Sequence, residues 1–149
     1  MKVDITILVP AIRKERWVHL YNSIKESTKR SFELIIVGPH NLPDELQRKI
    51  NVKYIKDFGN PVRASQIGSL IAEGKYIFWA SDDGTFQKGA LDKAMDCLEN
   101  QENKSINDVV ISNYREGGQA QSDDVLRLNV AYPKTPYIPE SRSKHTIIE

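Results

Sequence analysis

Short apolar runs separated by longer mixed stretches mark the chain from residue 5 to residue 112. The first two runs, Ile5–Val9 and Phe32–Val37, are almost continuously apolar, which is typical of strands buried on both faces of a parallel sheet. Shorter runs at Val52–Ile55, Tyr76–Ala80 and Asp108–Ser112 have the length and composition of further strands. Proline, glycine or polar residues follow each run at once. The pattern therefore predicts five strands.

Amphipathic helices are predicted between these strands. The first carries apolar residues at positions i, i+3, i+4 and i+7, on one helical face, at Trp17, Leu20, Tyr21 and Ile24. A second begins near Pro43, because proline suits a first helical turn and the acidic Asp44 and Glu45 suit the positive end of the helix dipole. The last has its apolar face at Leu91, Ala94, Met95 and Leu98.

The third predicted helix opens with Asn60–Pro61, a capping residue followed by proline. Its apolar stripe consists of Ile67, Leu70 and Ile71. Small residues recur every four positions, at Ala64, Gly68 and Ala72, and this spacing would let the helix lie close to a sheet. Gly74 is predicted to end the helix.

Alternation of strands and helices predicts an α/β fold, a Rossmann-like and mostly parallel sheet. Right-handed crossovers would place helices on both faces of this sheet. We assign residues 1–116 to this domain. In residues 117–149 we expect a turn at Glu116-Gly117-Gly118, one additional strand at Val125–Ala131, and an extended, partly disordered tail broken by several prolines.

Composition narrows the classes of function. The 149 residues fit one domain, and a net charge of +1 from interspersed basic and acidic residues gives no footprint for nucleic acid. The apolar runs are far shorter than the roughly 20 residues that span a bilayer, so no transmembrane segment is expected.

No secretory leader is apparent, and the single Cys97 excludes an internal disulfide, which favours the cytoplasm. The oligomeric state is not predicted. His19, His40 and His145 lie far apart in sequence and are interpreted as surface residues.

Candidate chemistry lies directly after the strands, because ligands of open parallel sheets bind at the carboxyl ends of the strands. Arg13, Asp57, Asp82 and Asp83 would all lie on that edge. Two adjacent carboxylates repel each other, so a fold retains such a pair where something positive lies between or beside them. Mg²⁺ or Mn²⁺ bound by Asp82 and Asp83 would bridge a diphosphate. The alternative is that Ser81-Asp82-Asp83-Gly84 is only a turn, a role for which Ser, Asp and Gly are favoured.

The order and spacing of the motifs resemble family 2 glycosyltransferases of the GT-A fold. Such proteins open with a strand that ends in proline, here Ile5–Pro10, and carry a second strand similar to Phe32–Gly38 about thirty residues later. Val62–Gly68 resembles the helix start of the family. Ala72-Glu73-Gly74-Lys75-Tyr76-Ile77, leading into the acidic residues, is the most specific match. The resemblance covers roughly residues 3–112, the nucleotide-sugar-binding part of such an enzyme.

The resemblance implies roles for individual residues. Asp82 and Asp83 would bind the metal and the diphosphate, with Ser81 beside them. Arg63 would reach the phosphates or brace the acidic loop, unless it is a solvated helix residue. The nucleoside would be bordered by residues at the ends of the first three strands, namely Pro10, Ala11, Gly38 and Asp57. The alternative for Asp57, a turn residue before Gly59, is slightly favoured. Arg13 is interpreted as the charged start of a helix. Trp17, Tyr76 and Trp79 are interpreted as core residues rather than sugar-stacking platforms.

Three departures from the family qualify the predicted activity. Gly38-Pro39 stands where the second strand usually ends in an acidic pair that reads the nucleobase. Ala80 replaces the aspartate that usually begins the acidic triplet. Family members continue past the fifth strand into an acceptor-binding region that supplies the general base, and no such region is apparent here. Asp123-Asp124 is a poor candidate for this base, because no strand or helix is predicted to hold it.

Two functions from different classes follow from the resemblance. The first is an inverting, metal-dependent glycosyltransferase that transfers a sugar from a nucleoside-diphosphate sugar to an unknown acceptor hydroxyl. The second is a non-catalytic or truncated module of the same fold that binds a nucleotide or a protein partner. A dinucleotide-binding domain is a weaker third interpretation, because no G-x-G-x-x-G follows the first strand.

Overall fold

A computed structural model describes residues 3–100, 115–116 and 119–120 of the chain. The chain divides into two compact units, Met1–Lys93 and Ala94–Glu149. The first unit holds the sheet and all the candidate residues named above. In the second, apart from the end of the last helix, the structure describes β5 (Arg115–Glu116) and β6 (Gln119–Ala120), which pair antiparallel.

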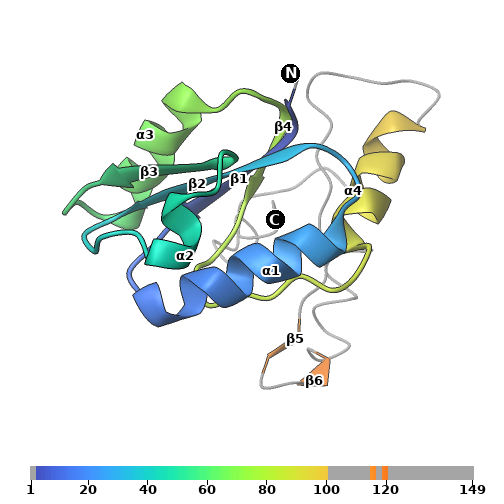
Figure 1. Ribbon diagram of the computed structural model, residues 1–149. Coiled ribbons are helices and arrows are strands. Elements are labelled where there is room, and N and C mark those ends of the chain that lie inside the picture. Colours follow the sequence, from blue (N-terminus) through green and yellow to red (C-terminus); the bar gives the residue numbers. More distant parts are fainter. Residues whose placement is uncertain (1–2, 101–114, 117–118, 121–149) are drawn as a thin grey trace, which may run out of the picture. The chain divides into compact units, whose positions relative to one another are not determined.

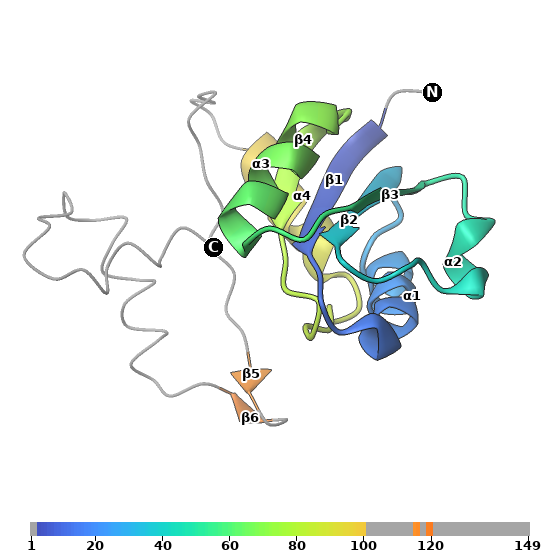
Figure 2. The same ribbon diagram turned by 90° about the vertical axis from the view of Figure 1, so that its left-hand side faces the viewer.

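Among the described residues, the sheet has four parallel strands in the order β3-β2-β1-β4 (Figures 1 and 2). They are β1 (Val3–Pro10), β2 (Phe32–Gly38), β3 (Val52–Lys56) and β4 (Gly74–Trp79). β1 is central and pairs with β2 on one side and with β4 on the other. The first four predicted strands and their parallel arrangement are confirmed. The fifth predicted strand lies outside the described residues.

Helices cover both faces of the sheet, as predicted. They are η1 (Lys14–Arg16), α1 (Trp17–Ser27), α2 (Asp44–Gln47), α3 (Pro61–Ile71) and α4 (Ala90–Glu99). Figures 1 and 2 show α1 and α3 on opposite sides of the strands. α4 begins beside the end of α1, where the Leu91 amide donates to Ser27 Oγ and the Thr28 hydroxyl donates to Asp92 Oδ1 at 2.6 Å. Within the described residues, no helix has the length and apolarity needed to span a bilayer.

α3 lies close to the sheet because its inward face is made of small residues. Asn60 caps the helix by accepting from the Arg63 amide, and Pro61 follows in the first turn, as predicted. Ala64 packs into a core cluster with Leu8, Ile35 and Val37. A Cβ on Gly68 would lie 2.0 Å from Leu8 Cδ1. Glycine at this position therefore sets the distance at which the helix rests on β1.

Gly74 begins a strand rather than ending a helix, which corrects the sequence prediction. α3 ends at Ile71, and Gly74 is the first residue of β4, opposite Val3. A Cβ at this position would lie 2.4 Å from the Thr6 amide nitrogen. Glycine is needed here because β4 approaches β1 closely at this point.

Trp79 also differs from its prediction. Trp17 is fully buried, as expected of a core residue, and Tyr76 is half-buried, but Trp79 is 59% exposed. Trp79 is the register partner of Leu8 on β1 and so shares the face on which α3 lies. α3 packs against β1 and β2, so the cover that it gives Leu8 does not extend over Trp79.

A buried polar network joins the strands beneath α3. Glu33 Oε1 accepts from the Thr6 hydroxyl at 2.5 Å and from the Glu73 amide at 2.6 Å. Lys53 Nζ lies 2.7 Å from Glu33 Oε2, close enough for an ion pair although the angle is not that of a hydrogen bond. Burial alone would raise the pKa of Glu33, but the contacts with Lys53 and Thr6 outweigh it and lower the pKa. The ionised carboxylate is thus the form that the fold stabilises.

Acid is therefore expected to destabilise the protein. The pKa values of Asp4, Glu33 and Asp82 are all lowered in the folded chain, so the unfolded chain binds more protons as the pH falls. The free energy of unfolding should be highest above the ordinary glutamate value of 4.5 and should decline below it. Urea denaturation across this range measures the decline. Glu33→Gln should make it shallower, and an unchanged slope would contradict the role of Glu33.

The predicted boundary at residue 116 falls where the structure describes only β5 and β6. The two strands flank the position of the predicted turn, whose two glycines lie outside the described residues, as do the predicted strand at Val125–Ala131 and the tail. The boundary and the tail stay predictions.

Candidate functional site

The loops after all four strands lie along one edge of the sheet. Their order follows the strand order, with Asp57 after β3, Gly38 at the end of β2, Ala11–Arg13 after β1 and Asp82 after β4. Hydrogen bonds connect neighbouring loops, since the Asp57 amide donates to Gly38 O at 3.0 Å and the Ala11 amide donates to Val37 O at 2.9 Å. The edge is therefore a continuous structure rather than four separate turns.

Asp82 anchors the β4 loop to the β1 loop. Its Oδ2 accepts from the backbone amides of Ile12 and Arg13, each at 2.6 Å, and its Oδ1 accepts from Arg13 Nη1 at 2.6 Å. The residue is only 1% exposed. A buried carboxylate is stable only when such donors replace water. The Gly84 amide donates to Ser81 O, so the segment also forms the predicted turn.

The electrostatics of the site keep Asp82 ionised. Its burial would raise the pKa, but the amides of Arg13 and Ile12 and the Arg13 guanidinium together lower it. The same contacts raise the pKa of Arg13. Asp82 and Arg13 therefore form a charged pair at neutral pH.

Asp83 is placed differently from Asp82. Its side chain is 47% exposed, and its Oδ2 lies 3.4 Å from Arg13 Nη1. The Ser81 hydroxyl donates to Asp83 Oδ1. Arg16 Nη2 donates to the Asp83 carbonyl at 3.2 Å. Asp83 thus faces solvent beside two guanidinium groups.

A second charged pair lies at the β3 end of the edge. Asp57 is nearly buried, and its Oδ1 accepts from Arg63 Nε at 3.0 Å while its Oδ2 accepts from the Gly59 amide. Arg63 therefore contacts Asp57 instead of bracing the acidic loop, and its expected contact with the phosphates stays a prediction. It is also not a purely solvated residue, although 64% of its side chain is exposed.

Gly38 sits beneath the β1 loop. A Cβ at this position would lie 1.8 Å from the carbonyl oxygen of Ala11. Ala11 is buried, and Pro10 is half-buried at the end of β1. This close approach leaves no room for a side chain at position 38.

Arg13 is the residue whose role the sequence interpretation missed. It does precede a helix, as the residue before η1, but its side chain and amide both bind Asp82. Basic residues directly after the first strand, together with acidic residues after another strand of the same edge, were the available signal. Of the three histidines, His19 and His40 are exposed as predicted, and His145 lies outside the described residues.

These contacts bear on the metal site that the sequence predicts. Mg²⁺ and Mn²⁺ require oxygen ligands with free lone pairs. Asp82 Oδ2 already accepts two amides, and Arg13 Nη1 lies between Asp82 and Asp83. The described residues contain no cluster of three or more His, Cys, Asp or Glu side chains able to hold a metal. As arranged, these carboxylates do not fit a metal ion.

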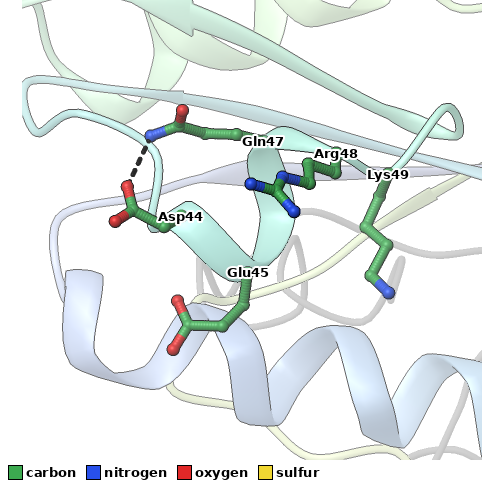
Figure 3. A pocket seen from close by; sticks show the side chains of 5 residues that line it. All are labelled: Asp44, Glu45, Gln47, Arg48 and Lys49. Carbon is green, nitrogen blue, oxygen red and sulfur yellow. Dashed lines mark hydrogen bonds between the residues drawn. The ribbon is translucent and has the colours of Figure 1, made fainter.

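A surface hollow of about 600 Å³ lies elsewhere, around α2 (Figure 3). Its lining is polar and consists of Asp44, Glu45, Gln47, Arg48 and Lys49. Gln47 spans part of it by donating to Asp44 Oδ1. None of the site residues predicted from the sequence lines this hollow. The chemistry of the strand edge is therefore the better guide to function.

Comparisons with known proteins bear on the fold. No family model matches the chain, and no curated protein matches its sequence. Among solved structures, a crystal structure of S. aureus TarS 1-349 is similar, with a TM-score of 0.58 and 18% sequence identity. The fold is glycosyltransferase-like. The match covers 74% of this chain but only 38% of the TarS chain, so this chain spans well under half of that structure.

Proposed function

We propose that this chain is the nucleotide-sugar-binding part of a family 2-like glycosyltransferase. The observation that carries the proposal is the continuous edge formed by the four strand ends. It combines a buried carboxylate held by backbone amides, a half-exposed carboxylate, and the arginines at positions 13, 16 and 63. The similarity in fold to TarS supports this proposal.

The charges along this edge suit a nucleoside diphosphate. Arg13 and Arg16 flank the β4 loop, and planar guanidinium groups bind phosphate oxygens through paired hydrogen bonds. At the β3 end, Asp57 accepts hydrogen bonds beside Gly38, where a base or ribose could donate. A diphosphate near the β4 loop and a nucleoside near β2 and β3 would follow the order of the strands.

The proposed reaction is a single displacement with inversion. The acceptor oxygen forms a bond to the anomeric carbon, while the bond from that carbon to the diphosphate oxygen breaks and its electron pair leaves with the nucleoside diphosphate. The hydroxyl proton passes to a general base. The arginines would stabilise the negative charge that develops on the departing diphosphate.

A non-catalytic nucleotide-binding module is the second candidate. It is favoured by the contacts of Asp57 and Asp82, which engage both carboxylates in structural hydrogen bonds and leave neither placed as a free general base. Asp123-Asp124 lies outside the described residues. Transfer or hydrolysis of a radiolabelled sugar separates the two candidates.

Calorimetric titration with uridine, guanosine, cytidine and thymidine diphosphates tests the shared part of the proposal. We expect one of them to bind. Arg63→Ala should weaken that binding by about tenfold, because Asp57 would lose the guanidinium that holds its carboxylate at the proposed nucleoside position. Lys49→Ala, which removes an exposed cation near α2, is the matched control and should leave affinity unchanged. Absence of binding by all four diphosphates would refute the donor-site assignment.

A further inference from the structure

The position of Arg13 between the two carboxylates has a consequence for how a diphosphate would be bound. Its Nη1 atom lies 2.6 Å from Asp82 Oδ1 and 3.4 Å from Asp83 Oδ2. A divalent cation that joins these two carboxylates would need to occupy the same space. The protein thus places its own cation where the sequence pattern predicts a metal.

We propose that the Arg13 guanidinium replaces a divalent metal, so that the site binds a nucleoside diphosphate without Mg²⁺ or Mn²⁺. This inference rests on the proposed function for the identity of the ligand. It departs from the expectation of metal dependence that the sequence resemblance carries.

Charge balance supports this replacement. Asp82 and Asp83 contribute two negative charges, and Arg13 and Arg16, which both contact this loop, contribute two positive charges. The loop is therefore neutral before any ligand binds. A divalent ion at the same place would be repelled by both guanidinium groups.

The remaining donors of Arg13 point to its role in binding. Nη1 makes both carboxylate contacts, and no partner within the described residues is found for Nη2 or Nε. The side chain is 45% exposed. A guanidinium fixed by a buried carboxylate on one side and open on the other can bind phosphate oxygens with little further loss of side-chain entropy.

The backbone holds the arrangement in place. The Ile12 and Arg13 amides both donate hydrogen bonds to Asp82 Oδ2. A shift of the β1 loop that carried the guanidinium away from Asp82 would therefore break these two hydrogen bonds as well. Removing only the Arg13 side chain would leave these amides in place. It would free Asp82 Oδ1 and Asp83 Oδ2 as a pair of oxygen ligands, which is the set that Mn²⁺ uses together with phosphates.

The experiment compares the wild-type chain with Arg13→Ala, using Mn²⁺ alone and the binding diphosphate with Mn²⁺ or with EDTA. Wild-type protein should leave the electron paramagnetic resonance signal of free Mn²⁺ unchanged and should bind diphosphate equally, within about twofold, in both conditions. Arg13→Ala should lose about tenfold to a hundredfold in EDTA, reduce the free Mn²⁺ signal, and recover binding when Mn²⁺ is added.

Two control variants accompany this comparison. Arg48→Ala removes an exposed arginine near α2 and should behave as wild type. Arg13→Lys retains a cation with a single nitrogen, so it should weaken diphosphate binding but keep it independent of metal. Circular dichroism checks the folding of each variant. If Arg13→Ala does not fold, Arg13→Lys and the wild-type measurements decide the question.

The outcomes separate this inference from the proposed function. Diphosphate binding by the wild type only with Mn²⁺, or binding of Mn²⁺ alone, would overturn the replacement of the metal and leave the donor site standing. Unchanged affinity of Arg13→Ala in EDTA would also overturn it. Failure of every diphosphate to bind the wild type, with or without metal, would refute the proposed function itself.

Discussion

Replacing Asp82 with alanine is expected to have the largest effect on the site, lowering both stability and ligand binding. The variant loses three short hydrogen bonds that join the β4 loop to the β1 loop, and it leaves the Ile12 and Arg13 amides without their acceptor. Hydrogen bonds to a charged group contribute about 1.5–3 kcal/mol each and are not additive, so we expect a loss of about 3 kcal/mol. Urea denaturation measures this loss.

Asp83→Ala is the matched control for Asp82→Ala. The Asp83 side chain is half exposed, and its contact with Arg13 is 3.4 Å long, so its removal should cost less than about 1 kcal/mol. Diphosphate binding should become undetectable in Asp82→Ala, because the loop that carries Arg13 is no longer held. Equal stability of the two variants would show that the amide contacts of Asp82 do not hold these loops together.

Gly38→Ala, at the end of β2, is expected to disrupt the same edge of the sheet. Its Cβ would lie 1.8 Å from the Ala11 carbonyl oxygen, and this contact is with backbone rather than with a side chain that could rotate away. The β1 loop would have to move, which would displace the Arg13 and Ile12 amides from Asp82. We expect a cost near the upper end of overpacking effects, about 3 kcal/mol, together with loss of diphosphate binding.

Gly84→Ala tests whether the effect at Gly38 comes from the clash rather than from the change of glycine to alanine. Its Cβ would lie 3.2 Å from Ser81 O, so a small shift would relieve the contact, and the cost should stay below about 1 kcal/mol. Thermal denaturation followed by circular dichroism compares the two variants. If Gly38→Ala proved as stable as Gly84→Ala, the β1 loop would have to shift at little cost to accommodate the added methyl group.

The strands could be predicted because burial on both faces leaves a direct trace in the sequence. β1 and β2 are nearly continuous apolar runs, and their fully buried residues, such as Ile7 and Ile35, match those runs. The start of α3 was equally clear, because Asn60 and Pro61 act through local chemistry. Structural features that depend on a few neighbouring residues could thus be predicted from the sequence.

Contacts between distant segments could not be predicted in the same way. The partner of Arg13 depends on the path of the β1 loop, and helix-start chemistry explained its charge equally well. Gly74 and Trp79 were misinterpreted for a similar reason. The first is needed for approach to Thr6, and the second lies beyond the cover of α3, and neither fact is visible in the local pattern.

The strand order has a consequence for how the site forms during synthesis. Strand β1 emerges first, but its partner β4 and the anchor Asp82 come much later, and the amide contacts of Asp82 bridge 69 and 70 residues. Contacts of such long range form late and slow folding, because the intervening chain must first be ordered. A nascent chain that ends before Asp82 can pair β1 with β2 and β2 with β3 but lacks the anchor. The proposed diphosphate site would therefore form only when β4 docks beside β1, so ligand binding would report on the docking of that strand.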